Sequence, residues 1–242
     1  MNYQIVLPSI PRENKIRITQ NLSEKIGIEY LTDDQVDKVM DHLASQIKKH
    51  SEEGHPSRAL VVKRYRFLFQ ILLQTGVRVG EVVHWYDPRL KVKYGIRPLD
   101  FHLDDGPLGH LYVHTEKKKN DSIRAIPLPP ALRTQFLEFI LEIGLPLRSK
   151  EYLFPMTRQS VDWYLKRVGR DIGLRVSEKH QLHAHIFRHT FGVRCSLNGV
   201  PLQIAQQWMG HSDPTITLIY QRIHQMDTSQ FMSMMNKSAE ER

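Results

Sequence analysis

The sequence of 242 residues lacks the features that mark secreted and membrane proteins. Its single cysteine, Cys195, excludes an internal disulfide and fits a reducing compartment. No run approaches the roughly 18 unbroken apolar residues that cross a membrane. The opening segment, MNYQIVLPSIPREN, has no basic stretch followed by a long apolar run, so no signal peptide is predicted. Internal repeats and low-complexity tracts are also missing, and we expect a globular cytoplasmic protein.

Acidic residues are in the minority. The chain has 34 Lys and Arg against 26 Asp and Glu, which gives a formal net charge of +8 and a pI near 9.5. This balance favours a polyanionic partner such as nucleic acid. The cations form no long block and are spread through the folded part, as a binding groove requires and as a solvated surface also shows.

Apolar residues recur at helical spacing through most of the chain. LTDDQVDKVMDHLASQIKKH predicts a helix behind a Thr32 cap, and ALVVKRYRFLFQILLQT predicts a buried central helix that ends at Gly76. VGEVVHWY begins another helix. Residues 89–128 look extended, with LYVHT and IRAIPL as a hairpin around the turn EKKKNDS. Further helices are predicted in PALRTQFLEFILEIG, SVDWYLKRVGRDIG, LHAHIFRHTFGVRCSLNG and PLQIAQQWM. The fold class is α+β, mainly α, with one small antiparallel sheet.

The segment MGHSDPTITLIYQRI, residues 209–223, combines a helix start with two reactive side chains. Asp213 is suited to cap a helix, and Pro214 fits the first helical position because its missing N–H would be unpaired anyway. Tyr220 then lies about two turns into the helix, and His211 lies in the turn before it. Alone, this pair could equally be a core tyrosine and a surface histidine without a functional role.

Two further stretches carry basic residues at defined places. In TGVRVGE, Arg78 follows the buried helix directly, where the chain leaves the core. In HAHIFRH, the spacings of three and four place His185, Arg188 and His189 on neighbouring parts of one helical surface.

A metal site is the alternative for this region, which holds four histidines: His180, His183, His185 and His189. The last two have the i, i+4 spacing of zinc ligands, and the corresponding function would be a zinc hydrolase. However, Ile186 and Phe187 occupy the gap in which an HExxH site has its glutamate. Arg188 would also repel a cation. We therefore predict no metal.

Together, TGVRVGE, HIFRH and MGHSDPTITLIY resemble three motifs of the tyrosine recombinase (phage integrase) family, in the same order along the chain. The resemblance covers about residues 30–225 and implies the family's catalytic fold. We expect an N-terminal arm at 1–28, the catalytic domain at 29–225 and a C-terminal tail at 226–242.

The resemblance implies a site-specific DNA recombinase that needs no metal, ATP or cofactor. Tyr220 would attack the scissile phosphate and form a 3′-phosphotyrosine link. Arg78 and Arg188 would stabilise the charge on the phosphate oxygens, and His211 would donate a further hydrogen bond. His185 is the implied proton acceptor for the tyrosine.

The family also uses a lysine in the turn of its β-hairpin as general acid for the departing 5′-oxygen. Counting back from Pro127 selects Lys119, and Lys118 and Lys117 remain alternatives. Glu81 is expected to be a buried partner that orients its neighbours. His189 is expected to be structural, holding the helix or a neighbouring carboxylate.

Strand exchange implies double-stranded DNA at specific sites as partner and a homo-tetramer on that DNA, with a monomer or weak oligomer when free. The Met- and Phe-rich tail is a candidate for exchange between subunits, and folding back on its own domain is the alternative. Only about 28 residues precede the catalytic domain, where family members usually carry a helical DNA-clamping domain. The chain is either a naturally short recombinase or a form that has lost its first domain. The stretch of residues 86–110 is longer than the compact strand that family members usually have at this place, and its role is open.

Two rival functions use the same fold. A type IB topoisomerase would relax supercoiled DNA without a partner site, and a DNA-binding regulator would keep the fold without strand exchange. The small size and the HxxRH motif favour the recombinase over the topoisomerase, and the suitable residues at all six catalytic positions argue against the regulator. Integration, excision, inversion and plasmid multimer resolution share this chemistry, so the DNA site and the biological role stay open. A bacterial, nucleoid-associated location is implied by the family alone.

Overall fold

The computed structural model describes residues 29–116, 122–177, 180–211 and 220. Its helices are α2 (Asp33–Glu52), α3 (Pro56–Thr75), α4 (Val79–Val82), α5 (Pro130–Ile143), α6 (Arg158–Asp171), α7 (Ala184–Leu197) and α8 (Leu202–Met209). Its strands are β1 (Trp85–Asp87), β2 (Val92–Tyr94), β3 (Phe101–His102), β4 (His110–His114) and β5 (Ile123–Pro127), with a 3-10 turn at Pro98–Asp100. The order agrees with the predicted α+β, mainly helical architecture.

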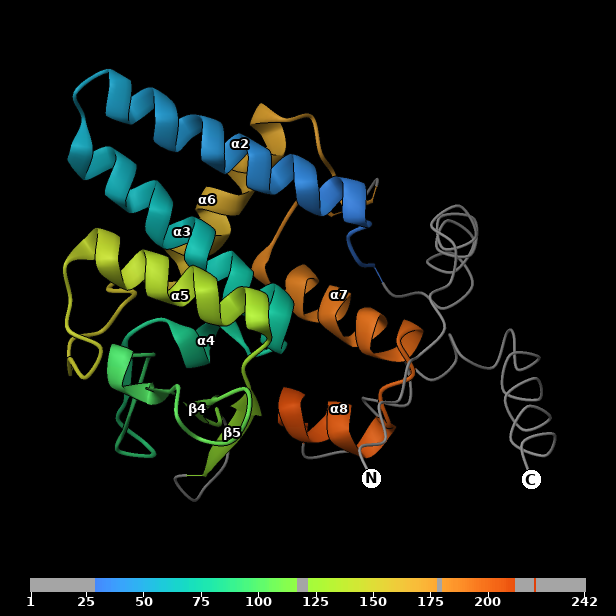
Figure 1. The fold of residues 1–242 in the computed structure, drawn as a ribbon. Coiled ribbons are helices and arrows are strands. Elements are labelled where there is room, and N and C mark those ends of the chain that lie inside the picture. Colours follow the sequence, from blue (N-terminus) through green and yellow to red (C-terminus); the bar gives the residue numbers. More distant parts are fainter. Residues whose placement is uncertain (1–28, 117–121, 178–179, 212–219, 221–242) are drawn as a thin grey trace, which may run out of the picture.

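Helix α3 is the centre of the fold, as its apolar sequence predicts. It packs against α2, α5 and α7, which surround it in Figure 1. The helix ends at Gly76, whose backbone is left-handed (φ 65°) and whose missing Cβ leaves room for the ring of Phe191. Helix α2 begins with the predicted Thr32 cap, which accepts a hydrogen bond from the Gln35 N–H at 3.3 Å.

The sheet content exceeds the prediction of one small sheet. Strands β3, β4 and β5 form the expected antiparallel sheet, with Tyr112 opposite Ala125 across the hairpin. Strands β1 and β2 form a second sheet, in which Trp85 lies opposite Tyr94. This second sheet begins in the stretch VGEVVHWY, where a longer helix was expected. Helix α4 ends after four residues: the Val83 N–H still bonds to the Val79 carbonyl, but the His84 N–H bonds to the Phe154 carbonyl instead of continuing the helix.

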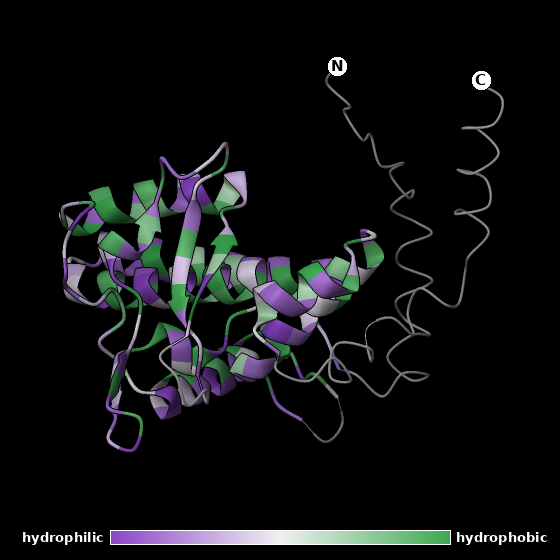
Figure 2. Cartoon of the chain, turned by 90° about the horizontal axis from the view of Figure 1, so that it is seen from below, coloured by the Kyte–Doolittle hydropathy of each residue, from purple (hydrophilic) through white to green (hydrophobic). Residues whose placement is uncertain are grey.

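Helices α7 and α8 lie together beside the hairpin and carry a second, smaller apolar cluster. Its buried members are Phe191, Val193, Cys195, Ala205, Met209 and Tyr220. Hydrophilic and hydrophobic residues alternate along the helices in Figure 2. Among the described residues, no helix is both long and apolar enough to cross a membrane. The predicted helix after Asp213 and the C-terminal tail lie outside the described residues.

Candidate active site

Arg78, the first residue of the site along the chain, lies just after the end of helix α3. The left-handed turn at Gly76 redirects the chain, and Arg78 then becomes the N-cap residue of α4. Its guanidinium Nη1 lies 3.3 Å from Glu81 Oε1 and 3.4 Å from the Gly210 carbonyl oxygen. About a quarter of the side chain is exposed (23%), so this arginine reaches both a buried carboxylate and the surface.

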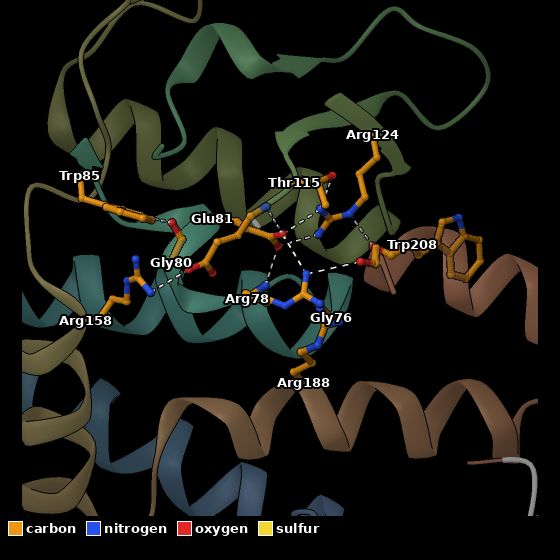
Figure 3. A network of polar contacts seen from close by, with 12 residues as sticks. Gly76, Arg78, Gly80, Glu81, Trp85, Thr115, Arg124, Arg158, Arg188 and Trp208 are labelled. Atoms are coloured by element: carbon orange, nitrogen blue, oxygen red, sulfur yellow. Dashed lines mark hydrogen bonds and ion pairs between the residues drawn. The ribbon is translucent and has the colours of Figure 1, made fainter. Parts of the chain in front are cut away.

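Glu81 is the buried centre of the surrounding polar network (Figure 3). Its carboxylate accepts hydrogen bonds from Arg124 at 2.6 and 3.0 Å and from the backbone N–H groups of Arg78 (2.8 Å) and Glu116 (3.0 Å). Burial alone would raise the pKa of Glu81, but Arg124 and Arg78 lower it below its ordinary value. The prediction that Glu81 is buried is confirmed, and its contacts with Arg78 fit the predicted orienting role.

Arg124 joins the hairpin to α8. This β5 residue was not predicted as part of the site, and it bonds the Trp208 carbonyl through Nε (2.9 Å) and the Thr115 hydroxyl through Nη1 (3.0 Å). The signal was the basic residue of RAIPL at an inward-facing strand position. Two parts of the chain that are about 84 positions apart are thereby held together beside Arg78.

Arg188 lies on α7 and is almost fully buried (2% of the residue is exposed). Nη1 donates to the Gly76 carbonyl, while Nη2 is buried without a hydrogen-bond partner among the described residues. Burial and the neighbouring Arg78 lower the pKa of Arg188 to about 9, so it remains a cation near neutral pH. A buried donor without a partner is costly, and an anion bound here would satisfy it.

A pocket of about 250 Å³ opens over these arginines. Its wall includes Arg78, Arg188, Glu116, Arg158, His183 and His185. The carboxylate of Glu116 does not stand alone there, because Arg158 Nη1 lies 2.8 Å from it. Arg158 also stacks over the ring of Trp85 at 4.1 Å, and Trp85 Nε1 donates to the Gly80 carbonyl at 2.6 Å. This second ion pair was missed because its partners are 42 positions apart.

His211 follows α8 at the left-handed Gly210 and is 8% exposed. Burial and the cations Arg188 and Arg78 lower the pKa of His211 to about 3. His185, exposed on the first turn of α7, has its pKa lowered to about 4 by desolvation, His189 and Arg188. Both rings are therefore neutral near pH 7 and each keeps one N–H to donate.

Tyr220 is 5% exposed and is seated on α7. Its hydroxyl lies 2.8 Å from His189 Nδ1, and its carbonyl accepts a 2.7 Å hydrogen bond from the Ser196 hydroxyl. Burial raises the pKa of Tyr220 to about 12, although Arg188 acts in the opposite direction. His189 was expected to hold the helix or a neighbouring carboxylate, but it contacts the tyrosine hydroxyl. The sequence had indicated His185 as the proton acceptor for this tyrosine.

Five of the six predicted catalytic residues lie in the described part of the chain. Arg78, Arg188 and His185 line one pocket. The electrostatic influence of Arg188 reaches both His211 and Tyr220. The sixth, Lys119, and its alternatives Lys117 and Lys118 lie outside the described residues. Within the part that the structure describes, no group of three His, Cys, Asp or Glu side chains converges as metal ligands would.

A family comparison matches residues 29–227 to the model of the phage integrase family. The chain belongs to this family. The match covers more than half of the chain and includes all three motifs. The order of Arg78, His185–Arg188 and His211–Tyr220 along the sequence therefore has a family basis as well as a spatial one.

Curated relatives of this phage integrase family member are tyrosine recombinases. XerD of Staphylococcus aureus (strain Mu50 / ATCC 700699) is 27% identical over 183 residues, covering 72% of this chain and 54% of the relative. XerD of Bradyrhizobium diazoefficiens is 26% identical over 187 residues, covering 72% of this chain and 52% of the relative. The chain thus spans about half the length of the curated relatives it matches.

Solved structures support the fold. XerH site-specific recombinase bound to difH substrate superposes with a TM-score of 0.56 at 24% identity, covering 80% of this chain and 50% of that chain. XerA recombinase gives 0.52 at 19% identity, covering 86% and 64%. The Tn1549 transposon integrase in complex with transposon right end DNA gives 0.52 at 21% identity, covering 79% and 60%. The predicted tyrosine recombinase/integrase catalytic fold is confirmed.

Proposed function

We propose that the chain is a site-specific DNA recombinase that breaks and rejoins DNA strands through a 3′-phosphotyrosine intermediate. Its reaction would serve integration, excision, inversion or plasmid multimer resolution. The single observation that carries this function is the buried Arg188, whose Nη2 has no hydrogen-bond partner in the described part of the chain, while Arg78 and His185 line the same pocket. A phosphate diester is an anion that matches such a set of donors.

The reaction divides among the site residues as follows. The Tyr220 oxygen attacks phosphorus, the bond to the 5′-oxygen breaks, and the phosphotyrosine keeps the bond energy for rejoining. Arg78, Arg188 and His211 bind the non-bridging oxygens as negative charge develops on these oxygens. One such donor stabilises the transition state by roughly 3 kcal/mol. His185 stands at the pocket wall with one N–H to give to the phosphate. Lys119 delivers a proton to the departing 5′-oxygen.

Double-stranded DNA at a specific site is the proposed partner. The net charge of +8 supports it, as do the relatives whose structures contain recombination DNA. We further propose a homo-tetramer on DNA and a monomer or weak oligomer when free, in the cytoplasm at the bacterial nucleoid. The proposed catalytic domain is 29–225, preceded by an arm at 1–28 and followed by a tail at 226–242 that passes to a neighbouring subunit.

The test is a covalent-complex assay on nicked suicide duplexes cut from the DNA that flanks the coding sequence. Wild type and Tyr220→Phe are compared on a denaturing gel with EDTA present. A covalent band that requires Tyr220 and survives EDTA is the expected result. Binding without a band would favour a DNA-binding regulator. Relaxation of supercoiled plasmid without a recombination site would favour a topoisomerase.

A further inference from the structure

The hydroxyl of Tyr220 makes its side-chain hydrogen bond with the second histidine of HIFRH, not with the first. The distance from Tyr220 Oη to His189 Nδ1 is 2.8 Å, which is ordinary for a hydrogen bond from a hydroxyl to an imidazole nitrogen. His189 directly follows Arg188 on α7. The proposed nucleophile therefore contacts an imidazole whose neighbour in the chain is the buried phosphate-binding arginine.

Two further contacts hold the tyrosine in this position. The Ser196 hydroxyl donates to the Tyr220 carbonyl at 2.7 Å, and the phenol ring lies against the Cα of Gly192. A Cβ at position 192 would lie 2.6 Å from Tyr220 Cζ, so the ring has no room on that side. Ser196, Gly192 and His189 all belong to α7. One helix therefore sets the position of the tyrosine and with it the contact between Oη and Nδ1.

The charged surroundings of His189 favour its neutral form. Burial and the nearby His183 and Arg188 lower the pKa of His189 to about 4, and only Glu29 acts in the opposite direction. The ring of His185 stands edge-on to it at 4.5 Å between centroids. Near pH 7 the imidazole is therefore neutral, and one of its ring nitrogens can accept a hydrogen bond.

We propose that His189 Nδ1 is the base that takes the proton from Tyr220 as the tyrosine attacks DNA, an inference that rests on the proposed function. The Oη–H bond breaks and an Nδ1–H bond forms, which leaves His189 as an imidazolium with protons on both nitrogens. At the same time Oη bonds to phosphorus and the 5′-oxygen leaves with a proton from the general acid. In the rejoining step His189 returns its proton to Oη, and the atoms balance in both directions.

This assignment separates two roles that the sequence motif does not distinguish. His189 serves the nucleophile, and His185 serves the phosphate from the wall of the pocket. It also fixes the resting tautomer of His189, because an acceptor at Nδ1 requires the hydrogen at Nε2.

The kinetic test uses the full chain and a nicked duplex that wild type cleaves in the assay above. His189→Asn keeps a hydrogen-bonding group near the Nδ1 position but has no base. Covalent-complex formation is followed in a single turnover between pH 6 and pH 9. We expect a loss of roughly 10²-fold or more at pH 7. The rate of the variant should rise about tenfold per pH unit, because phenolate then forms only through hydroxide. The wild-type rate should change little over this range.

His185→Asn is the matched control, since it changes the neighbouring ring of the same motif. We expect it to lower the rate without the rise with pH. A His189→Asn rate within a few-fold of wild type, a lower rate with a flat pH profile, or a faster rate would each overturn the assignment. Failure of the proposed function would appear separately, as a covalent band in Tyr220→Phe or as wild type that cleaves no flanking duplex.

A second measurement does not depend on activity, and its first readout needs no variant. Nitrogen-15 NMR of histidine-labelled wild type, without DNA, reports the tautomer of each ring. The proposal expects the Nε2–H form for His189, with an Nδ1 shift that changes in Tyr220→Phe. An Nδ1–H tautomer for His189, or no response to the loss of the Tyr220 hydroxyl, would contradict it.

Discussion

The phenol ring of Tyr220 lies directly on the backbone of Gly192, at a separation that excludes any side chain at position 192. A helix-interior Gly→Ala change normally stabilises a protein by roughly 0.5–1 kcal/mol. Here the new Cβ would displace the tyrosine from its seat. Gly192→Ala is therefore expected to reduce the covalent complex at least tenfold while DNA binding in a gel shift stays within a few-fold. An unaffected covalent complex would mean that Tyr220 reacts from another position.

The buried carboxylate of Glu81 is expected to carry a large share of local stability. Glu81→Gln leaves Arg124, itself 8% exposed, without its charge partner. Breaking a buried pair in this way costs about 3–5 kcal/mol, measured as the free energy of unfolding in urea. Glu142→Gln is the comparison, because the pair of Glu142 with Lys63 is partly solvent-exposed and is worth less than about 1 kcal/mol. Equal losses in the two variants would contradict the central role of Glu81.

Stability should decrease as the pH falls below about 6.5. The pKa values of His189 and His211 are lowered to about 4 and 3 in the folded chain, whereas the unfolded chain takes up protons near the ordinary pKa of 6.5. Each histidine therefore contributes its full stabilisation above pH 6.5 and loses up to about 1.4 kcal/mol per pH unit below it. Glu81, with its pKa lowered below 4.5, adds no slope in this window.

Urea unfolding at about pH 7.5, 6.5 and 5.5 measures this dependence. His211→Gln removes one of the histidines with a lowered pKa, so its free energy of unfolding should fall less steeply over the same range. His185, whose pKa is also lowered, contributes in the same direction to wild type and to His211→Gln and therefore does not alter the comparison. If wild type and His211→Gln lose stability in parallel, His211 is not held neutral in the folded chain.

The ion pair of Arg158 with Glu116 is expected to keep the pocket suitable for phosphate. Arg158→Met would leave the Glu116 carboxylate, which is 8% exposed, without its ion-pair partner at the wall of that pocket. We expect DNA binding to weaken on the order of tenfold, about 1.4 kcal/mol. Adding Glu116→Gln should restore binding, since it removes the uncompensated charge. A double variant as weak as Arg158→Met would instead indicate that Arg158 touches DNA itself.

Sequence reasoning recovered the features that are local. Thr32 as a cap, the apolar α3 helix and the hairpin strands follow from short-range patterns, and the three motifs located Arg78, Arg188 and Tyr220. What escaped prediction depends on residues that are distant in the chain. Nothing near Trp85 indicates that Arg158 will stack on it, and a helical reading of VGEVVHWY ignored the sheet formed with residues 92–94. The choice between His185 and His189 as the partner of Tyr220 likewise needs the position of the tyrosine on α7.

The hydrogen bonds and ion pairs of Glu81 also limit which insertions and deletions the hairpin can accept. One carboxylate bonds the Arg78 N–H, the Glu116 N–H at the end of β4 and the Arg124 guanidinium on β5. A one-residue insertion in either strand would turn Arg124 or its neighbours to the opposite face and break this junction. Changes of length are therefore compatible with an intact Arg78 only in the residues between Glu116 and Ile123. In diverging copies of this chain, changes of length within the hairpin should fall between those two positions, while both strands keep their lengths.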